Sequence, residues 1–358
     1  MNFQWNVNFL RQGAEMARLA FCGEADYNII ADFDTQGGGR MTEKSTAGQA
    51  VGRFAPSPSG YLHLGNLLSA LLAWLDIRSL GGEMVFRLED LDPARSDPAF
   101  AEAMAEDLRW LGLDWDRGWP QEAGYAQSER TALYEEAFQT LKEQGLAYPC
   151  WCSRSKRLAA ASAPHPGEQE ADLGCRCSRM SQAEREALLK TGRNPAWKLN
   201  SPDQDIRIND GHYGLFIQNP AREAGDCIIR RSDGVYAYQL AVSVDDMRMG
   251  ITRVVRGRDL LASAPRQKWL IETLGGRAPD YCHSPLLTGD KGKLSKRLGS
   301  LSTELLRKQA APEALVGRLA FLCGLTETDA PVAPRELISL FSWDKIKTED
   351  IEITSDAH

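Results

Sequence analysis

A segment rich in glycine and proline, residues 53–66, has residue types that suit a polyphosphate ligand. Its sequence, RFAPSPSGYLHLGN, leads from an apolar stretch into a helical pattern that begins near Gly65. The N-terminus of a helix presents free amide N–H groups and the positive end of a dipole, which favour phosphate. Gly65 lets a nucleotide approach the backbone closely, and His63 can donate to a phosphate oxygen. Taken alone, the segment is equally consistent with an ordinary strand–turn–helix corner that binds no ligand.

A second basic segment lies far along the chain, at residues 292–297, with the sequence GKLSKR. Lys293, Ser295 and Lys296 stand there in a loop that begins with a glycine, and they offer mobile donors for a polyphosphate. In isolation, the segment is equally consistent with a solvated basic loop. The two segments together, in this order, indicate a nucleotide site.

Four of the eight cysteines form two close pairs, Cys150-x-Cys152 and Cys175-x-Cys177. Four thiolates suit tetrahedral zinc, although the spacing within each pair is tighter than usual, so packed or free cysteines remain the alternative. His165, between the pairs, is a candidate substitute ligand. We expect the isolated cysteines to pack in the core: Cys22, Cys227, Cys282 and Cys323.

The hydrophobic periodicity around these motifs predicts an α/β fold. Residues 56–60 must form a loop, because two prolines and a glycine oppose regular structure. Strand, loop, helix and strand at this spacing favour a parallel nucleotide-binding sheet. We expect strands at 51–55 and 84–88 and helices at 66–79, 97–113 and 128–144, the last two with Asp97 and Ser128 as N-caps.

The composition is that of a globular chain of 358 residues, 43% hydrophobic and 25% charged. It excludes collagen-like, disordered and mini-protein classes, and no apolar run approaches the ~18–20 residues of a membrane span. With 42 Lys and Arg against 49 Asp and Glu, the net charge is −7. This argues against broad electrostatic binding of nucleic acid but allows an enzyme with a local basic groove. The chain opens without a secretory signal, so we expect a cytoplasmic protein.

The same signals divide the chain into five parts. Residues 1–50 are an appendage, interpreted either as a disordered or accessory arm or as a start-site artefact with Met41 as the true start. N-terminal sequencing of the native protein would decide this. The other parts are two halves of a catalytic domain at 51–147 and 201–302, a zinc-binding insertion at 148–200 and a short helical C-terminal region at 303–358.

Several ordered motifs resemble the class I aminoacyl-tRNA synthetases. Residues 63–66, HLGN, resemble the HIGH signature with Asn66 in place of its last histidine, and residues 293–297, KLSKR, resemble the KMSKS loop. Residues 52–60, 87–92 and 226–257 resemble the glutamyl/glutaminyl subgroup. The resemblance covers about residues 51–301. It implies an α/β fold, namely a Rossmann-like class I synthetase catalytic domain with a zinc-binding insertion and a short helical C-terminal remnant.

This resemblance implies roles for individual side chains. Arg53 would clamp the substrate carboxylate, since a guanidinium can bind it bidentately, and Glu89 would hold the substrate ammonium. Tyr238 and Arg256 match two further glutamate-contacting positions. The glutamate-binding strand and loop are matched by Arg53, Phe54, Ala55, Pro56 and Ser57. The ATP-binding positions are matched by His63, Gly65, Asn66, Lys293, Ser295 and Lys296, of which His63 and Lys296 would be catalytic.

The resemblance also assigns zinc ligands to Cys150, Cys152 and Cys175. Ala171 stands where the family often has a tyrosine, so Cys177 is expected to supply the fourth ligand. A closed four-sulfur site has no open coordination position, which implies one structural zinc ion per chain. Mg²⁺ is expected to accompany ATP.

The length of the C-terminal segment refines the expected activity. Only 62 residues (358 − 296) follow Lys296, fewer than a typical domain. A glutamyl-tRNA synthetase has a large anticodon-binding region at this point, so the chain is similar to the truncated paralogues of that enzyme. The resemblance then implies that L-glutamate is activated by ATP and transferred to queuosine at the wobble position of tRNA(Asp), by a monomer without membrane contact.

Three alternatives stay open. The first is a glutamyl-tRNA synthetase that charges tRNA 3′ ends, which the short C-terminal segment disfavours. The second is a small-molecule nucleotidyltransferase, which the glutamate-type motifs disfavour. The third is a non-catalytic RNA- or protein-binding paralogue, which the intact His63 and Lys296 disfavour.

Overall fold

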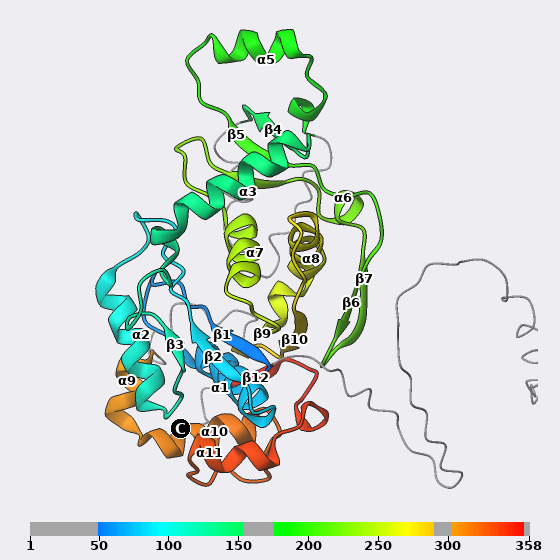
Figure 1. Cartoon of the computed structure of the whole chain (residues 1–358). Helices are drawn as coiled ribbons and strands as arrows, with labels where there is room; N and C mark the ends of the chain where they lie inside the picture. The colour runs from blue at the N-terminus through cyan, green and yellow to red at the C-terminus, as the bar shows by residue number, and fades with distance from the viewer. Residues whose placement is uncertain (1–48, 153–174, 290–301, 354–358) are drawn as a thin grey trace, which may run out of the picture. The chain divides into compact units, whose positions relative to one another are not determined.

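The computed structural model describes residues 49–152, 175–289 and 302–353 (Figure 1). The chain separates into two units, Met1–Thr46 and Ala47–His358. The first unit lies outside the described residues, as do the appendage prediction and Cys22. All the described residues belong to the second unit.

A parallel sheet forms the centre of this unit. Its first half has the order β1-β2-β3, and β1 and β2 pair in parallel from Val51 opposite Glu83. The second half is the parallel pair β9 and β10. The backbone N–H of Thr252, just before β9, donates to the carbonyl of Val51 at 2.9 Å, so β9 lies beside β1. The strands are β1 (Val51–Phe54), β2 (Glu83–Phe86), β3 (Arg117–Gly118), β9 (Arg253–Gly257) and β10 (Asp280–Ser284).

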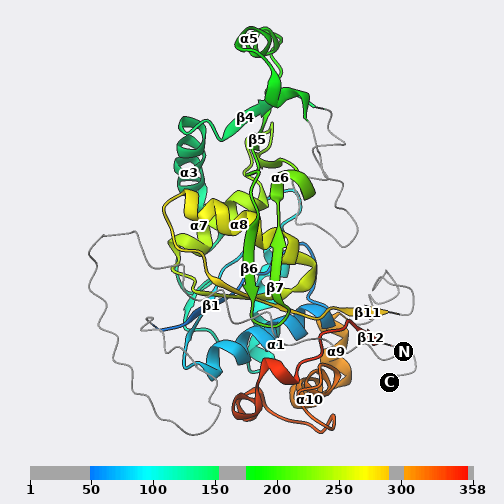
Figure 2. The same ribbon diagram turned by 90° about the vertical axis from the view of Figure 1, so that its right-hand side faces the viewer.

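Helix α1 (Leu64–Ser79) connects β1 to β2 and is apolar around most of its circumference. Such a helix must be covered on several sides. It packs on the sheet on one side, and on another it meets the C-terminal helices (Figure 2). The C-terminal elements are α9 (Thr303–Gln309), α10 (Pro312–Leu322), α11 (Pro334–Leu337) and β12 (Ile351–Ile353). Leu67 on α1 and Leu319 on α10 therefore share one core with Phe86.

Strand β12 pairs in parallel with β11 (Leu287–Gly289), the strand that follows β10. The C-terminal segment is therefore joined to the sheet by backbone hydrogen bonds as well as by the core.

A second group of elements covers the carboxyl side of the sheet. The antiparallel sheet β4-β5-β8 and helices α3, α7 and α8 enclose a separate core around Tyr134 and Leu240. Helix α5 stands at the far end of this group (Figures 1 and 2). The elements are α3 (Thr131–Glu143), β4 (Ala147–Cys150), α5 (Gln182–Leu189), β5 (Ala196–Leu199), β6 (Ile206–Asp210), β7 (Gly214–Gln218), α6 (Pro220–Glu223), β8 (Cys227–Arg230), α7 (Tyr238–Arg248) and α8 (Ala264–Thr273).

Most local predictions are confirmed. The strands and helices occur where the periodicity places them, and Asp97 caps α2 (Pro98–Trp110) by accepting from the N–H of Ala99 at 2.9 Å. Ser128 as an N-cap is wrong. It lies in a 3₁₀ turn, Gln127–Arg130, so that the N-cap position of α3 falls on Arg130, and both the N–H and the hydroxyl of Ser128 donate to Asp90. The three isolated cysteines within the described residues are buried, as expected: Cys227, Cys282 and Cys323. Among the described residues, no helix is long and apolar enough to cross a membrane.

Candidate functional site

The loop after β1 is held against the residues that follow β2. The N–H of Arg87 donates to the carbonyl of Phe54 and the N–H of Glu89 donates to that of Pro56, both at 2.9 Å. The pairing of the two strands thus continues beyond their ends. This places Glu89 beside the proline loop at the carboxyl edge of the sheet, where ligands of open α/β sheets bind.

The start of α1 presents His63 at the same edge. The Oδ1 of Asn66 accepts from the N–H of His63 at 3.1 Å, so the residue in place of the last HIGH histidine caps the helix. A Cβ on Gly65 would lie 3.2 Å from the His63 ring, and glycine therefore lets the imidazole lie close to the first turn. Partial burial lowers the pKa of His63 below its ordinary value. A neutral imidazole keeps one N–H to donate.

The chain lies beside His63 again at Ser302, five residues after the end of the basic segment. His63 and Ser302 form an antiparallel bridge, and the N–H of Thr303 donates to the carbonyl of Leu62 at 2.9 Å. Lys293, Ser295 and Lys296 themselves lie outside the described residues. Ser302, the first described residue after them, is nonetheless fixed beside His63.

A buried ion network lies beneath the proline loop. Arg87 is fully buried, and it donates through Nη1 to Asp246 Oδ1 at 2.6 Å and through Nη2 to Glu89 Oε1 at 2.9 Å. The Nε of Arg53 lies 3.8 Å from the same Asp246 oxygen and has no hydrogen-bond partner within the described residues. The Nη1 of Arg53 donates to the carbonyl of Val255 at 2.9 Å, which ties β1 to β9.

Arg256 is oriented by three acceptors, two of them buried and one partly buried. Its Nε lies 3.1 Å from Nε2 of His283, its Nη1 donates to Gln267 Oε1 at 2.7 Å, and its Nη2 donates to the carbonyl of Leu260 at 3.2 Å. The guanidinium also lies over the ring of Tyr281, 5.4 Å from the centroid. Its direction is therefore fixed before any ligand binds.

Charges from separate elements influence one another at this edge. Burial raises the pKa of Tyr238, the charges of Arg256 and Arg53 oppose this, and Glu89 reinforces it. Burial also raises the pKa of Glu89, against the lowering effect of Arg87 and Arg53. The fold thus brings together Arg53, Glu89, Tyr238 and Arg256, four of the residues that the sequence predicts to contact the glutamate substrate.

The other residues predicted to line the glutamate site differ in how far their side chains are buried. The side chain of Phe54 packs in the core, edge-on to Phe86 at 6.4 Å between centroids. Ala55 and Pro56 are half-buried and Ser57 is exposed. Because side chains alternate along a strand, Arg53 and Ala55 face opposite to Phe54.

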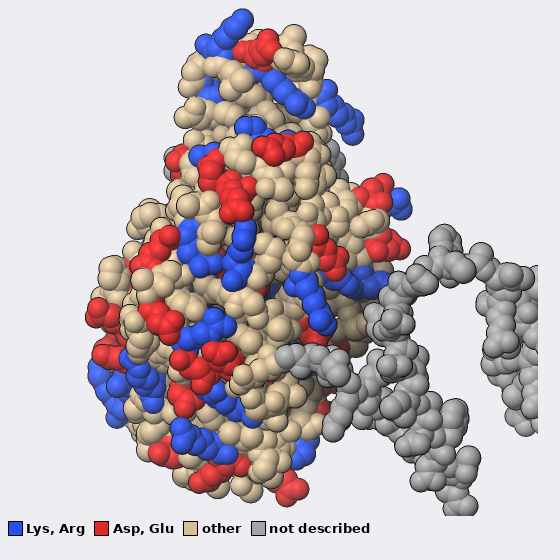
Figure 3. Space-filling model, viewed as in Figure 1, with Lys and Arg blue, Asp and Glu red and all other residues tan. Residues whose placement is uncertain are grey.

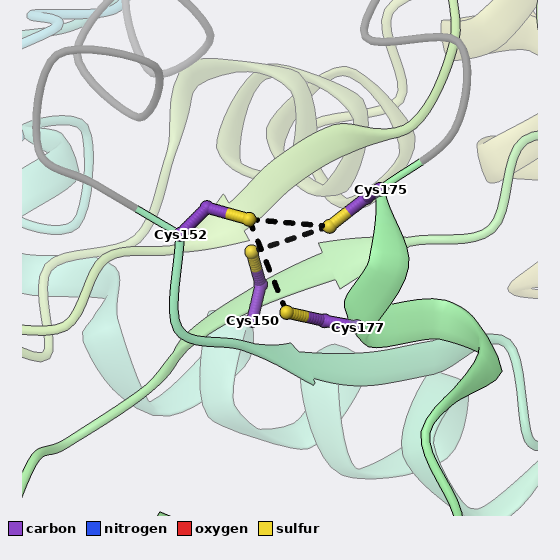
Figure 4. A group of neighbouring side chains, drawn as sticks. All are labelled: Cys150, Cys152, Cys175 and Cys177. Carbon is purple, nitrogen blue, oxygen red and sulfur yellow. Dashed lines mark hydrogen bonds between the residues drawn. The ribbon is translucent and has the colours of Figure 1, made fainter.

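The four paired cysteines converge at the end of β4 (Figure 4). Their sulfur atoms all lie within 4.8 Å of one another, with separations of 3.6 Å for Cys150–Cys175, 3.6 Å for Cys152–Cys175 and 3.9 Å for Cys152–Cys177. Sulfurs at the corners of a tetrahedron around zinc, with Zn–S bonds of about 2.3 Å, are separated by about 3.8 Å. The cluster can therefore hold a metal ion in the predicted four-thiolate form.

Neighbouring groups favour a thiolate at Cys175. Burial opposes its ionisation, but hydrogen bonds from the cluster and the charge of Lys198 lower the pKa of Cys175 below the ordinary value. Lys198 is buried, with 1% of its surface exposed. Its positive charge partly compensates a site in which four thiolates surround one divalent ion.

Known proteins resemble the chain along almost its whole described length. The family described as tRNA synthetases class I (E and Q), catalytic domain, matches residues 49–355. A glutamyl-Q tRNA(Asp) synthetase from Symbiobacterium thermophilum is 46% identical over 317 residues, which cover 85% of this chain and 96% of that protein. The chain belongs to the glutamyl-Q tRNA(Asp) synthetase family. This membership confirms the predicted Rossmann-like class I synthetase catalytic domain.

Relatives outside the glutamyl-Q tRNA(Asp) synthetase family share the same catalytic part. A glutamate–tRNA ligase from Coprothermobacter proteolyticus is 39% identical over 82% of this chain but only 63% of its own length. A glutamate-tRNA synthetase structure from Elizabethkingia anophelis superposes with a TM-score of 0.72 at 27% identity, covering 86% of this chain and 69% of that one.

Some residues of this glutamyl-Q family site were not predicted from the sequence. Asp246 and His283 are buried partners of Arg53 and Arg256, and the motifs in the sequence predict no role for either. Arg87 lies within the segment 87–92, but its buried ion pairs are likewise not predicted by that motif. Two adjacent aspartates within an apolar helical pattern, at 245 and 246, are the one signal that could have indicated buried ion pairs.

Proposed function

We propose that the protein activates L-glutamate with ATP and transfers it to queuosine in tRNA(Asp). The observation that carries this proposal is the convergence of Arg53, Glu89, Tyr238 and Arg256 at the carboxyl edge of the sheet. Two guanidinium groups and one carboxylate complement a zwitterionic amino acid. The substrate class also follows the family to which the chain belongs.

In the first step, a glutamate carboxylate oxygen attacks the α-phosphorus of ATP, and pyrophosphate leaves. Arg53 binds the substrate through donors such as the unpartnered Nε, and Glu89 holds the ammonium. Negative charge grows on the phosphate oxygens, where His63, the first amides of α1 and Lys296 would stabilise it. Little proton transfer is required, so positioning and electrostatics supply the acceleration.

In the second step, a hydroxyl of the queuosine cyclopentene ring attacks the activated carbonyl, and AMP leaves. The acceptor is part of a tRNA, whose phosphates require positive charge on the protein. Acidic and basic side chains are mixed on the face seen in Figure 3, and basic side chains gather around α5 at its upper end. These include Arg176, Arg179, Lys190 and Arg193, all exposed. Because ATP and tRNA are cytoplasmic, we place this activity in the cytoplasm. We also expect the protein to act as a monomer.

Two metal ions belong to this proposal. One Zn²⁺ per chain is held by Cys150, Cys152, Cys175 and Cys177, and its role is structural because the four sulfurs leave no open position. It joins the end of β4 to the turn before α5. Mg²⁺ accompanies ATP and screens the phosphate charges.

Labelled glutamate tests the proposal with two tRNA pools, one from normal cells and one from cells unable to make queuosine. We expect label only in the first pool, carried by tRNA(Asp). Equal label in both pools would instead indicate charging of 3′ ends, the activity in the name of the Coprothermobacter relative. Glutamate-dependent pyrophosphate exchange without label in either pool would support the activation step and contradict the acceptor.

A further inference from the structure

A chain of buried hydrogen bonds leads from Arg256 away from the glutamate site. The Nε of Arg256 lies 3.1 Å from Nε2 of His283, and Nδ1 of His283 lies 2.6 Å from Oδ2 of Asp210. His283 is on β10 with 0% of its surface exposed, and Asp210 ends β6 with 5% exposed. Neither Asp210 nor His283 lies in a motif that resembles the synthetases. The two hydrogen bonds of His283 thus link the β6–β7 hairpin to Arg256 in the site.

These hydrogen bonds permit only one tautomer of His283. A guanidinium only donates, so Nε2 must accept from Arg256 and cannot carry a proton. The proton therefore lies on Nδ1 and is donated to the Asp210 carboxylate. Burial lowers the pKa of His283 to about 4, against the raising effect of Asp210, so the imidazole is neutral at physiological pH.

Asp210 is itself fixed by the backbone around it. Its Oδ1 accepts from the N–H groups of His212 at 3.0 Å, Tyr213 at 2.9 Å and His283 at 3.2 Å. Oδ2 is then left to face the imidazole. The orientation of the carboxylate, and with it the tautomer, is set by the turn that follows β6.

We propose that His283 is a positioning residue for glutamate activation, which fixes the guanidinium of Arg256 through the single tautomer that Asp210 imposes. The inference rests on the proposed function, because Arg256 is assigned there to the substrate. His283 does not touch the substrate in this scheme. It acts by keeping the Arg256 side chain in one orientation before glutamate arrives, as preorganised sites require.

Two amide substitutions separate the two bonds of His283. In His283→Gln the side-chain oxygen reaches the place of Nε2 and still accepts from Arg256, whereas in His283→Asn the amide reaches only the place of Nδ1. Both variants lose one buried hydrogen bond. We expect the KM for glutamate in pyrophosphate exchange to be about tenfold or more higher in His283→Asn than in His283→Gln, because an unpaired buried guanidinium donor is unfavourable. The KM for ATP should be alike in the two.

A third variant tests the role of Asp210. In Asp210→Asn the three backbone N–H groups select the amide oxygen, so the NH₂ group faces Nδ1 of His283 and moves its proton to Nε2. An Nε2–H then opposes Arg256 Nε–H, and the KM for glutamate should rise although Asp210 lies two residues removed from the substrate. In ¹⁵N-histidine spectra of this chain with five histidines, His283 should carry its proton on Nδ1 in the native protein and on Nε2 in the variant.

The outcomes distinguish the inference from the function on which it rests. If the native protein shows no glutamate-dependent pyrophosphate exchange, the proposed function fails. If the native protein is active but His283→Gln and His283→Asn have the same KM for glutamate, the positioning role is overturned. Thermal melting of both variants checks that each folds, and an Nε2–H tautomer in the native protein would overturn the inference without any kinetic measurement.

Discussion

Arg87 and Asp246 form an ion pair from which water is excluded. The Nη1–Oδ1 distance is 2.6 Å, and the two side chains expose 0% and 3% of their surface. The same Asp246 oxygen lies 3.8 Å from Arg53, so one carboxylate stands between two arginines. Removing one partner of such a pair leaves an uncompensated buried charge, which is far less favourable than the loss of an exposed pair.

We therefore expect Asp246→Asn to lower the free energy of unfolding by about 3–5 kcal/mol and to raise the KM for glutamate through Arg53. Urea unfolding and pyrophosphate exchange measure the two effects. Asp233→Asn is a matched control, because Asp233 also pairs with an arginine, Arg231, but is half exposed. Its effect should stay within about 1 kcal/mol. Equal destabilisation by the two variants would contradict the buried-network interpretation.

The cysteine cluster predicts a specific response to losing one sulfur. Cys175→Ser should release the metal ion and lower the melting temperature, since metal binding and folding are coupled in such sites. Elemental analysis and a thermal scan check both. Cys323→Ser is the control, because Cys323 is also buried but lies in the α1 core. It should lose stability and keep its metal; loss of metal from both variants, or from neither, would refute the four-sulfur site.

Lys296 carries the expected ATP contact of the basic segment. Lys296→Ala should lower the rate of glutamate-dependent pyrophosphate exchange by about 10²–10³, the usual loss for one donor to a developing oxyanion. Lys308→Ala is the control, because Lys308 is exposed and pairs with Glu304 on α9. An unchanged exchange rate in Lys296→Ala would remove Lys296 from the activation step.

His283 predicts a pH dependence of stability. Its pKa is lowered from 6.5 to about 4 in the folded protein. Between these values the unfolded chain binds a proton that the folded one does not, so stability falls as pH falls from 6.5 towards 4. The full difference between the two pKa values of His283 corresponds to about 3 kcal/mol in the free energy of unfolding.

Denaturant titrations at pH 4.5 to 7 compare the native protein with His283→Gln, which should have a flatter profile. Burial raises the pKa of Glu89, which has the opposite effect on stability, but both proteins share Glu89 and it cancels in the difference. The pKa of Asp210 is lowered despite its burial, so its contribution is lost mainly below pH 4. Parallel profiles would show that His283 does not titrate in this range.

The sequence predicts those features that depend on local pattern. Pro56 and its neighbours had to form a loop, and Asp97 had to cap a helix, because each follows from backbone chemistry within a few residues. The N-cap prediction for Ser128 failed because a 3₁₀ turn precedes α3, in which Ser128 donates to Asp90, a residue distant in sequence. The glutamate-binding roles of Arg53, Glu89, Tyr238 and Arg256 are predicted by resemblance to known motifs.

The supporting network could not be predicted in this way. Asp246 and Arg87 are 159 residues apart, and Asp210 and His283 are 73 apart. Arg87 and Asp246 become partners only when helix α7 packs against the sheet, and Asp210 and His283 only when β6 lies beside β10. Buried polar pairing is a property of tertiary structure, and a single sequence carries no periodicity that reports it.

The bridge between His63 and Ser302 has a consequence for the entropy of the chain. His63 and Ser302 are 239 residues apart (302 − 63), so this bridge closes a long loop of the folded chain. The entropic cost of closing a loop grows only slowly with its length, so a contact this distant in sequence costs little more than one of half the separation.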